Sequence, residues 1–240
     1  MKQQMVLHCG GKPADLEDLR KVALPQETKS YKPLGHYPLV LTLGEVADKL
    51  LKDYEFDKGL YALSKDGQRM FGLHTYGTQT SDLSLAIGFR NSYDKSMSIG
   101  IAIGASVMIC DNLALSGDIT VLRKHTTNVI GDLEMMILRV MYRAEENFTQ
   151  ICESADQMKQ TELDDNGAFK MLGLLFGKNV LSPRQLPVAK KEWLSPSYSE
   201  FQPRNGWSFH NAVTAALKST PPNKILERHI RLHDLVTENL

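Results

Sequence analysis

The sequence predicts an α+β fold, in which a curved antiparallel β-meander of about five strands is packed by one long amphipathic helix and followed by a mainly helical C-terminal part. Two patterns carry this prediction. Apolar residues alternate with a period of two from Gly59 to Arg123, and then recur every three or four positions from Val129 to Met158. With 42% hydrophobic residues among 240, the chain can bury a core and fold on its own.

The first 38 residues are expected to form an N-terminal arm. They contain scattered prolines and little periodicity, apart from a short helix at Ala14 to Val22. A longer helix is expected from Leu43 to Tyr54. Thr42 and Glu45 have the spacing of a capping box, and apolar residues follow at helical intervals.

Turn signals divide the meander into strands. Lys65-Asp66-Gly67-Gln68 lies between two apolar runs and predicts a hairpin, because Asp-Gly favours tight turns. Asn91-Ser92-Tyr93-Asp94 separates a strand at Leu83 to Arg90 from one at Ser96 to Ile109. The last strand is expected at Leu113 to Arg123.

Glycines inside the strands indicate distortion of the sheet. Gly117 is expected to break or bulge the last strand. Gly88, Gly100 and Gly104 indicate bulges, strong curvature or the close approach of another backbone. The alternative, that these small residues make room for a neighbouring helix, stays open.

The pattern from Val129 to Met158 predicts a single helix of about 32 residues, about 48 Å long, that packs across the sheet. Shorter helices are expected at Ala168 to Phe176, Trp207 to Leu217 and Ile225 to Val236, and a proline-bearing segment before the second of these wraps over the domain. The expected organisation is an arm at residues 1–38, a core at 39–163 and a C-terminal part at 164–240 packed on the same domain.

Charge and cysteine content exclude several classes of protein. The 28 basic and 28 acidic residues cancel, so any polyanion site must be a local patch. Cys9, Cys110 and Cys152 lack the spacing of a disulfide framework or zinc site. The longest apolar run, Ile99 to Cys110, is shorter than the roughly 20 residues of a membrane helix, and the N-terminus has no secretory pattern. A cytoplasmic protein without membrane contact is expected.

No catalytic motif is present. Phosphate-binding glycine loops, HExxH and GxSxG are all missing, so no catalytic residue, metal or cofactor is predicted, and the expectation leans against an enzyme. His229 and His233 have the i, i+4 spacing of metal ligands, but no third ligand accompanies them. A solvated helix face is therefore the preferred interpretation of this pair.

The turn from Arg90 to Lys95 is the first candidate for a binding site. It is expected to expose Arg90, Asn91, Tyr93 and Lys95 together, where the cations could grip a phosphate and the aromatic ring could stack on a base. Turn propensity alone also explains the polar residues, so both interpretations stay open.

A second group of cations follows the last strand. Arg123 and Lys124 lie where this strand passes into the long helix, and they are expected to share a face with the Arg90 turn. Arg139 and Arg143, spaced i, i+4 on the helix, could extend the patch. Together with the turn, these residues form the predicted nucleic-acid-binding set.

Two motifs resemble a known family. The first is the run Phe89-Arg90-Asn91-Ser92-Tyr93-Asp94-Lys95-Ser96, which continues to Ile109-Cys110-Asp111-Asn112-Leu113; the second is Trp207-Ser208-Phe209-His210-Asn211-Ala212-Val213-Thr214. They are similar to the Asn-Ser-aromatic-Asp turn, the Cys-x-Asn strand end and the tryptophan helix of the phage/plasmid-like family called Domain of Unknown Function 932. This resemblance covers roughly residues 30 to 236. It implies a mobile genetic element in a bacterial cytoplasm and supplies no catalytic residue.

The sequence is compatible with three functions. The first is a nucleic-acid-associated protein that binds or anneals single-stranded DNA as a homo-oligomer, because a meander followed by a long helix is similar to the core of single-strand annealing proteins. The second is a non-enzymatic protein that binds and modulates a host defence or restriction system. The third, an enzyme acting on nucleotides, needs a catalytic cluster that only folding could assemble.

Overall fold

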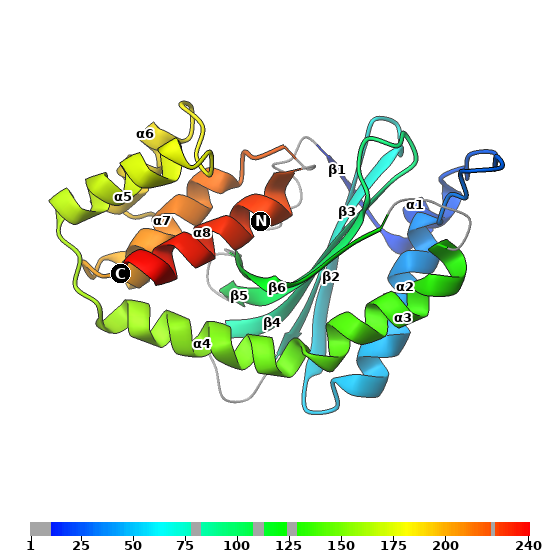
Figure 1. The fold of residues 1–240 in the computed structure, drawn as a ribbon, viewed down its shortest axis with the longest axis horizontal. Helices are drawn as coiled ribbons and strands as arrows, with labels where there is room; N and C mark the ends of the chain where they lie inside the picture. Colours follow the sequence, from blue (N-terminus) through cyan, green and yellow to red (C-terminus); the bar gives the residue numbers. More distant parts are fainter. Residues whose placement is uncertain (1–10, 78–82, 108–112, 124–128, 222–223) are drawn as a thin grey trace.

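The computed structural model describes residues 11–77, 83–107, 113–123, 129–221 and 224–240. It confirms the α+β fold: one antiparallel sheet packed by helices, with a helical C-terminal part (Figure 1). The strands lie in sequence order across the sheet, β1 (Lys12–Ala14), β2 (Glu55–Ser64), β3 (Arg69–Gly77), β4 (Leu83–Ser92), β5 (Ile99–Val107) and β6 (Leu113–Arg123).

The helices fall into three groups along the chain. The N-terminal pair is α1 (Leu16–Lys21) and α2 (His36–Leu50), and the middle pair is α3 (Val129–Tyr142) and α4 (Ala144–Gln160). The C-terminal part contains α5 (Asp165–Gly177), α6 (Leu186–Leu194), the short 3-10 helix η2 (Ser199–Phe201), α7 (Gly206–Leu217) and α8 (Ile225–Asn239). In the described part of the chain, none of these helices combines the length and apolar character needed to cross a membrane.

The meander β2–β6 is the predicted one, and its β2–β3 turn lies where the sequence predicted it. Lys65, Asp66 and Gly67 all have positive φ, at 51°, 53° and 85°, which closes the β2–β3 hairpin. The pairing of β5 with β6 shifts register between Ala102, opposite Thr120, and Gly104, opposite Leu115. This shift lies at the strand irregularity expected around Gly117.

A sixth strand comes from the expected N-terminal arm. β1 pairs antiparallel with β2, so that Lys12 lies opposite Leu63 and Ala14 opposite Tyr61. A strand of three residues is too short to show alternation, so it was not predicted from the sequence. The pairing fixes part of residues 1–38 to the edge of the sheet.

The capping box predicted at Thr42 is wrong. α2 begins at His36 with Gly35 as its N-cap, and Thr42 lies inside the helix, where its hydroxyl donates to the carbonyl of Pro38 at 2.9 Å. Pro38 is compatible with the first turn because the N–H groups there need no helical acceptor. The same proline had favoured an irregular arm over a helix start.

The single long helix is also wrong, because it breaks at Arg143. The backbone of Arg143 has φ −105° and ψ 5°, outside the helical region, and separates α3 from α4. Figure 1 shows that the two helices run in sequence beneath the sheet. α3 contacts α2, whereas α4 contacts α7. The two halves of the predicted helix therefore pack against different helices.

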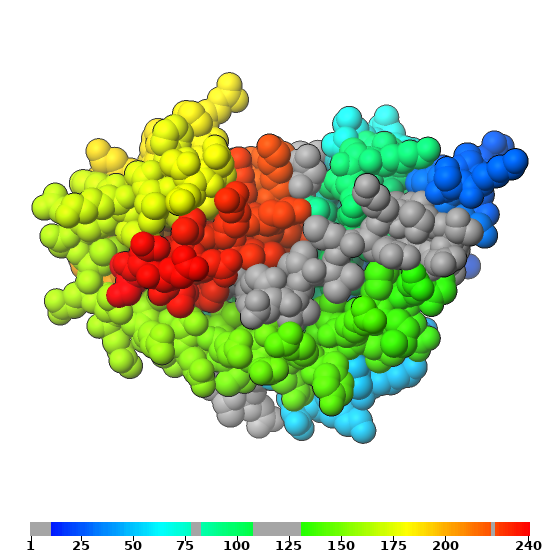
Figure 2. Space-filling view, in the orientation of Figure 1, coloured from blue at the N-terminus to red at the C-terminus, as the bar shows by residue number. Residues whose placement is uncertain are grey.

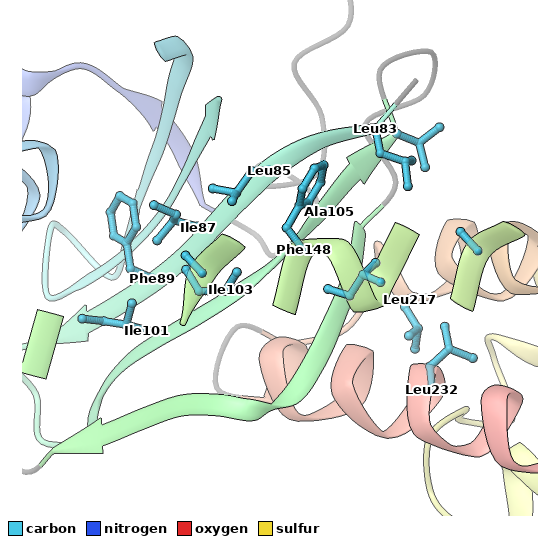
Figure 3. Packing of buried hydrophobic residues seen from close by; sticks show 14 of the residues in the cluster. Leu83, Leu85, Ile87, Phe89, Ile101, Ile103, Ala105, Phe148, Leu217 and Leu232 are labelled. Carbon is cyan, nitrogen blue, oxygen red and sulfur yellow. The ribbon is translucent and has the colours of Figure 1, made fainter. Parts of the chain in front are cut away.

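The main core fills the space between one face of the sheet and the helices. Leu85, Ile87 and Phe89 of β4 point toward the helical layer that contains Phe148 of α4, and the same cluster continues to Leu232 of α8 (Figure 3). Because one cluster joins the meander to the C-terminal helices, these helices pack on the sheet domain. In Figure 2 the orange and red C-terminal helices lie beside α4.

The opposite face of the sheet packs against the start of α8. Ala62, Phe71 and Ala102 form a second cluster with Leu226. A Cβ at Gly88 would lie 3.2 Å from Cδ2 of Leu226, closer than ordinary van der Waals contact. This observation favours the interpretation of Gly88 as a residue that makes room for a helix.

The C-terminal part adds two helical segments to the prediction and departs from it at two histidines. The proline-bearing segment, expected to wrap over the domain, contains α6 and η2. His229 and His233 are not on a solvated face, since only 0% and 6% of their surfaces are exposed. α8 turns them inward, and the ring of His233 lies 5.8 Å, centroid to centroid, from that of His210 on α7.

Candidate nucleic-acid interface

The turn predicted to be exposed is largely buried. Arg90, Asn91 and Tyr93 are 4%, 0% and 4% exposed, so the prediction that their side chains are available to solvent is wrong. The physical reason is that strand alternation sends Arg90 to the face covered by α8, while Asn91 and Tyr93 contact the segment before α2.

Arg90 is held by a carboxylate from the far end of the chain. Its Nη1 and Nη2 donate to the two carboxylate oxygens of Glu227 at 2.9 and 2.6 Å, a bidentate pair between β4 and α8. The Arg90 side chain is 5% exposed and that of Glu227 is 40% exposed. The Arg90 guanidinium therefore pairs with the Glu227 carboxylate, and not with a phosphate as predicted.

Asn91 anchors the segment that leads into α2. Its side-chain amide donates to the carbonyl of Leu34 at 2.8 Å and lies 3.0 Å from Nδ1 of His36. Nε2 of His36 lies 2.9 Å from the carbonyl of Gly67, so the geometry fits a neutral imidazole with its proton on Nε2. Asn91 thereby joins β4, the start of α2 and the β2–β3 turn.

Tyr93 completes this anchor. Its hydroxyl accepts a hydrogen bond from the His36 backbone N–H at 2.9 Å, and its ring stacks on the His36 ring at 3.9 Å with an interplanar angle of 3°. The hydroxyl of Tyr31 donates to the Tyr93 carbonyl at 3.0 Å. Burial raises the pKa of Tyr93 despite the hydrogen bond from His36, which lowers it.

We expect Tyr93→Phe to lower the free energy of unfolding by about 1.5 kcal/mol, because the buried N–H of His36 loses its acceptor while the ring stacking is retained. Urea unfolding monitored by circular dichroism measures this. Tyr37→Phe, on the half-buried ring of α2, is the matched control and should change stability little. A Tyr93→Phe variant as stable as the parent protein would contradict the anchor role.

The exposed part of the turn is Asp94, Lys95 and Ser96. Lys95 has φ 60°, and its Nζ lies 4.4 Å from the centroid of the Tyr31 ring, a cation–π contact. Asp94 accepts from Nε of Arg69 at 2.7 Å. Partial burial raises the pKa of Asp94, but hydrogen bonds from Ser96 and Arg69 outweigh this and leave that pKa below its ordinary value.

Of the remaining predicted cations, Arg139 and Arg143 do not form one patch with Arg90. Arg123 pairs in register with Ile99, which puts its backbone at the end of the sheet where the β4–β5 connection lies. Lys124 lies outside the described residues. Arg139 and Arg143 are exposed, but they belong to the helical layer against the main core face, whereas Arg90 faces α8 on the other side.

A different cationic site lies at the hairpin end of the sheet. β1, α1 and the β2–β3 turn enclose an open cleft of about 640 Å³, and Lys12, Lys21 and Lys65 are among its lining residues. All three lysines are exposed. The lining also contains two carboxylates, those of Asp18 and Asp66. Asp18 accepts a hydrogen bond from the Asp15 N–H at 3.1 Å in the capping box of α1.

The floor of this cleft depends on a close backbone approach. Gly67 has φ 85°, and a Cβ on it would lie 3.0 Å from the side chain of Val22. The carbonyl of Gln68, which also lines the cleft, accepts from the Tyr93 N–H at 2.7 Å. The cleft is therefore adjacent to the Lys95 turn. Sequence reasoning missed it because Lys12 and Lys65 are brought together only by the pairing of β1.

Side chains that could bind a metal or act as a nucleophile are few in the described part of the chain. Among those residues, no three histidine, cysteine or acidic side chains are arranged to hold a metal ion. His210, His229 and His233 are buried between α7 and α8, and Cys152 is a half-buried free thiol. The other predicted cysteines, Cys9 and Cys110, lie outside the described residues.

No protein-family model, curated protein or solved structure matches this chain.

Proposed function

We propose that this protein is a nucleic-acid-associated protein that binds single-stranded DNA through the lysine-lined cleft at the hairpin end of its sheet. The observation that carries the proposal is the convergence of Lys12, Lys21 and Lys65 on one open cleft. Lysine ammonium groups bind phosphates as point charges, and a strand that crosses the cleft releases counterions from each neutralised phosphate.

The neighbouring turn supplies a second type of contact. Lys95 is exposed and lies over the Tyr31 ring, next to the cleft through the Gln68–Tyr93 hydrogen bond. A phosphate that leaves the cleft in this direction meets a further cation whose position is fixed by the ring beneath it. The expected footprint runs from Lys21 to Lys95, a length suited to a short run of nucleotides.

The biological setting in this proposal follows from the family resemblance. It is a mobile genetic element in a bacterial cytoplasm, with the protein acting on DNA as a homo-oligomer. Binding without base-specific contacts suits strand annealing, because a sequence-tolerant groove accepts any strand.

Fluorescence anisotropy with labelled single-stranded DNA at two salt concentrations tests the proposal. Lys12→Glu/Lys65→Glu should weaken binding at least about tenfold and reduce the dependence of log K on log salt by about one per lysine. Lys170→Glu, an exposed lysine of α5, is the control for net charge. Arg123→Glu/Lys124→Glu tests the site predicted at the end of β6 separately.

Failure of the parent protein to bind at low salt would overturn the proposal, and equal losses in the cleft and control variants would show binding by net charge alone. The alternative is a non-enzymatic protein that binds a host defence or restriction protein. The cancelling totals of 28 basic and 28 acidic residues favour this alternative, since phosphate contacts dominate affinity for DNA.

A further inference from the structure

The outer face of α3 carries apolar side chains that the fold does not bury. Met135 is 56% exposed and Tyr142 is 85% exposed, the highest value among the large exposed hydrophobic side chains of the described residues. The inner face of the same helix, with Leu133, Ile137 and Val140, lies in the main core. Among the described residues, the inner stripe of α3 lies in the core, whereas Met135 and Tyr142 of the outer stripe stay exposed.

The spacing of the outer stripe is that of a coiled-coil seam. Gly131, Met135, Leu138 and Tyr142 are separated by four, three and four residues, the alternation of d and a positions in a heptad. Leu138 is half-buried, and a Cβ at Gly131 would meet nothing within 4 Å. Leu138 packs against the main core, so the exposed apolar side chains of the seam are Met135 and Tyr142.

The charges that flank the seam identify its occupant. Glu134 occupies the g position before Met135, and Arg139 occupies the e position after Leu138; both are exposed. In a parallel pair of helices, a g residue faces the e residue five positions later on the other helix. Glu134 of each copy then meets Arg139 of the other, so the pattern is complementary to itself.

An antiparallel pair lacks this complementarity. In that arrangement e positions face e positions, so the two Arg139 side chains of a seam centred on Leu138 would approach each other. A nucleic acid is also a poor occupant, because Glu134, Glu145 and Glu146 are exposed beside the two arginines of this surface. The charge pattern is therefore best satisfied by a second copy of the same helix in parallel orientation.

We propose that two copies of this chain associate through the α3 seam, with their α3 helices parallel about a twofold axis. The seam is short and covers less than the roughly 800 Å² per partner of a standard stable interface, so the dimer forms in the micromolar range or above. Arg143 ends the seam, because the backbone leaves the helix there. The inference rests on the homo-oligomeric part of the proposed function and is independent of DNA binding.

Sedimentation velocity without DNA, from low micromolar to a few hundred micromolar protein, tests the proposal. The parent chain should shift from monomer to dimer with concentration, and Glu134→Arg should raise the dissociation constant about tenfold by opposing two cations. The charge swap Glu134→Arg/Arg139→Glu should restore it. Glu153→Arg, an exposed position of α4, is the matched control and should leave association unchanged.

Disulfide cross-linking distinguishes the orientation. Met135→Cys should form a covalent dimer under mild oxidation, because a parallel seam puts position 135 beside its copy, whereas the unsubstituted chain should not. A chain that stays monomeric at every concentration, or an association that ignores the Glu134 and Arg139 changes, overturns the proposal. If the parent protein dimerises but does not bind DNA in the anisotropy assay, the result contradicts the proposed DNA-binding cleft and leaves the α3 dimer supported.

Discussion

Lowering the pH from 6.5 to 5 should reduce the free energy of unfolding by several kcal/mol, because buried histidines stay neutral in the folded state. Burial lowers the pKa of His74 and of His233 to about 4. The pKa of His210 also lies well below its ordinary value, because of burial first and then of the nearby His233 and His229. In the unfolded chain each of these groups takes up a proton near pH 6.5.

The sign follows from the protons bound in each state. Between about pH 6.5 and pH 4 the unfolded chain binds more protons than the folded one, so stability rises with pH and is lost on acidification. Each of His74 and His233 contributes a loss of up to about 3 kcal/mol, complete once the pH reaches the folded value near 4. No comparable change is expected from these groups above pH 7.

Urea unfolding at a series of pH values measures this slope. The interval from pH 6.5 to 5 is the informative one, since most carboxylates titrate below it. His233→Gln removes one titrating group and should make the slope shallower by about 1 kcal/mol per pH unit over this interval. A free energy of unfolding that stays flat over this interval would show that the imidazoles are not buried as the structure has them.

Glu227→Ala should destabilise the protein by about 3 kcal/mol, since it removes the carboxylate that receives both hydrogen bonds from a guanidinium only 5% exposed. The reciprocal change, Arg90→Met, should cost only about 1 kcal/mol, because Glu227 is 40% exposed and water can solvate its carboxylate. The asymmetry is the signature of a pair in which one partner is buried and the other is not.

Thermal and urea unfolding of both variants and of the double variant measure these costs. The double variant should be close to Arg90→Met alone, since the guanidinium that makes the loss of Glu227 costly is already gone. Glu238→Ala, an exposed acidic residue of the same helix, is the control and should change stability by less than about 0.5 kcal/mol. Equal costs for Glu227→Ala and Glu238→Ala would contradict a structural role for the pair.

Local patterns predicted much of the fold. The Asp66-Gly67 turn, the order of strands β2 to β6 and the positions of α7 and α8 followed from alternation and turn chemistry, which depend on neighbouring residues only. The break at Arg143 could not be predicted in this way. No proline or glycine marks it, and the two helices on either side of it pack against different neighbours, α2 and α7, which lie far apart in the sequence.

The candidate site was harder to predict because burial depends on distant residues. Asn91 and Tyr93 have the composition of an exposed turn, and only the packing of His36 against them makes them core. The burial of His229 and His233 was unpredictable for the same reason. Their spacing predicts that they share one face of a helix, but not that another part of the protein covers this face. Lys12 and Lys65 became neighbours through a strand of three residues.

The sequence order of the strands has a consequence for synthesis on the ribosome. Each strand pairs with the one made just before it, so the sheet can form as it emerges, whereas α8 joins the sheet only after Ile225–Asn239 has been synthesised. Until then Phe71, Leu73 and Ala102 lack the cover that Ile225 and Leu226 later provide. A nascent chain stalled before α8 therefore exposes an apolar surface that chaperones can bind, and this surface becomes buried once α8 packs on the sheet.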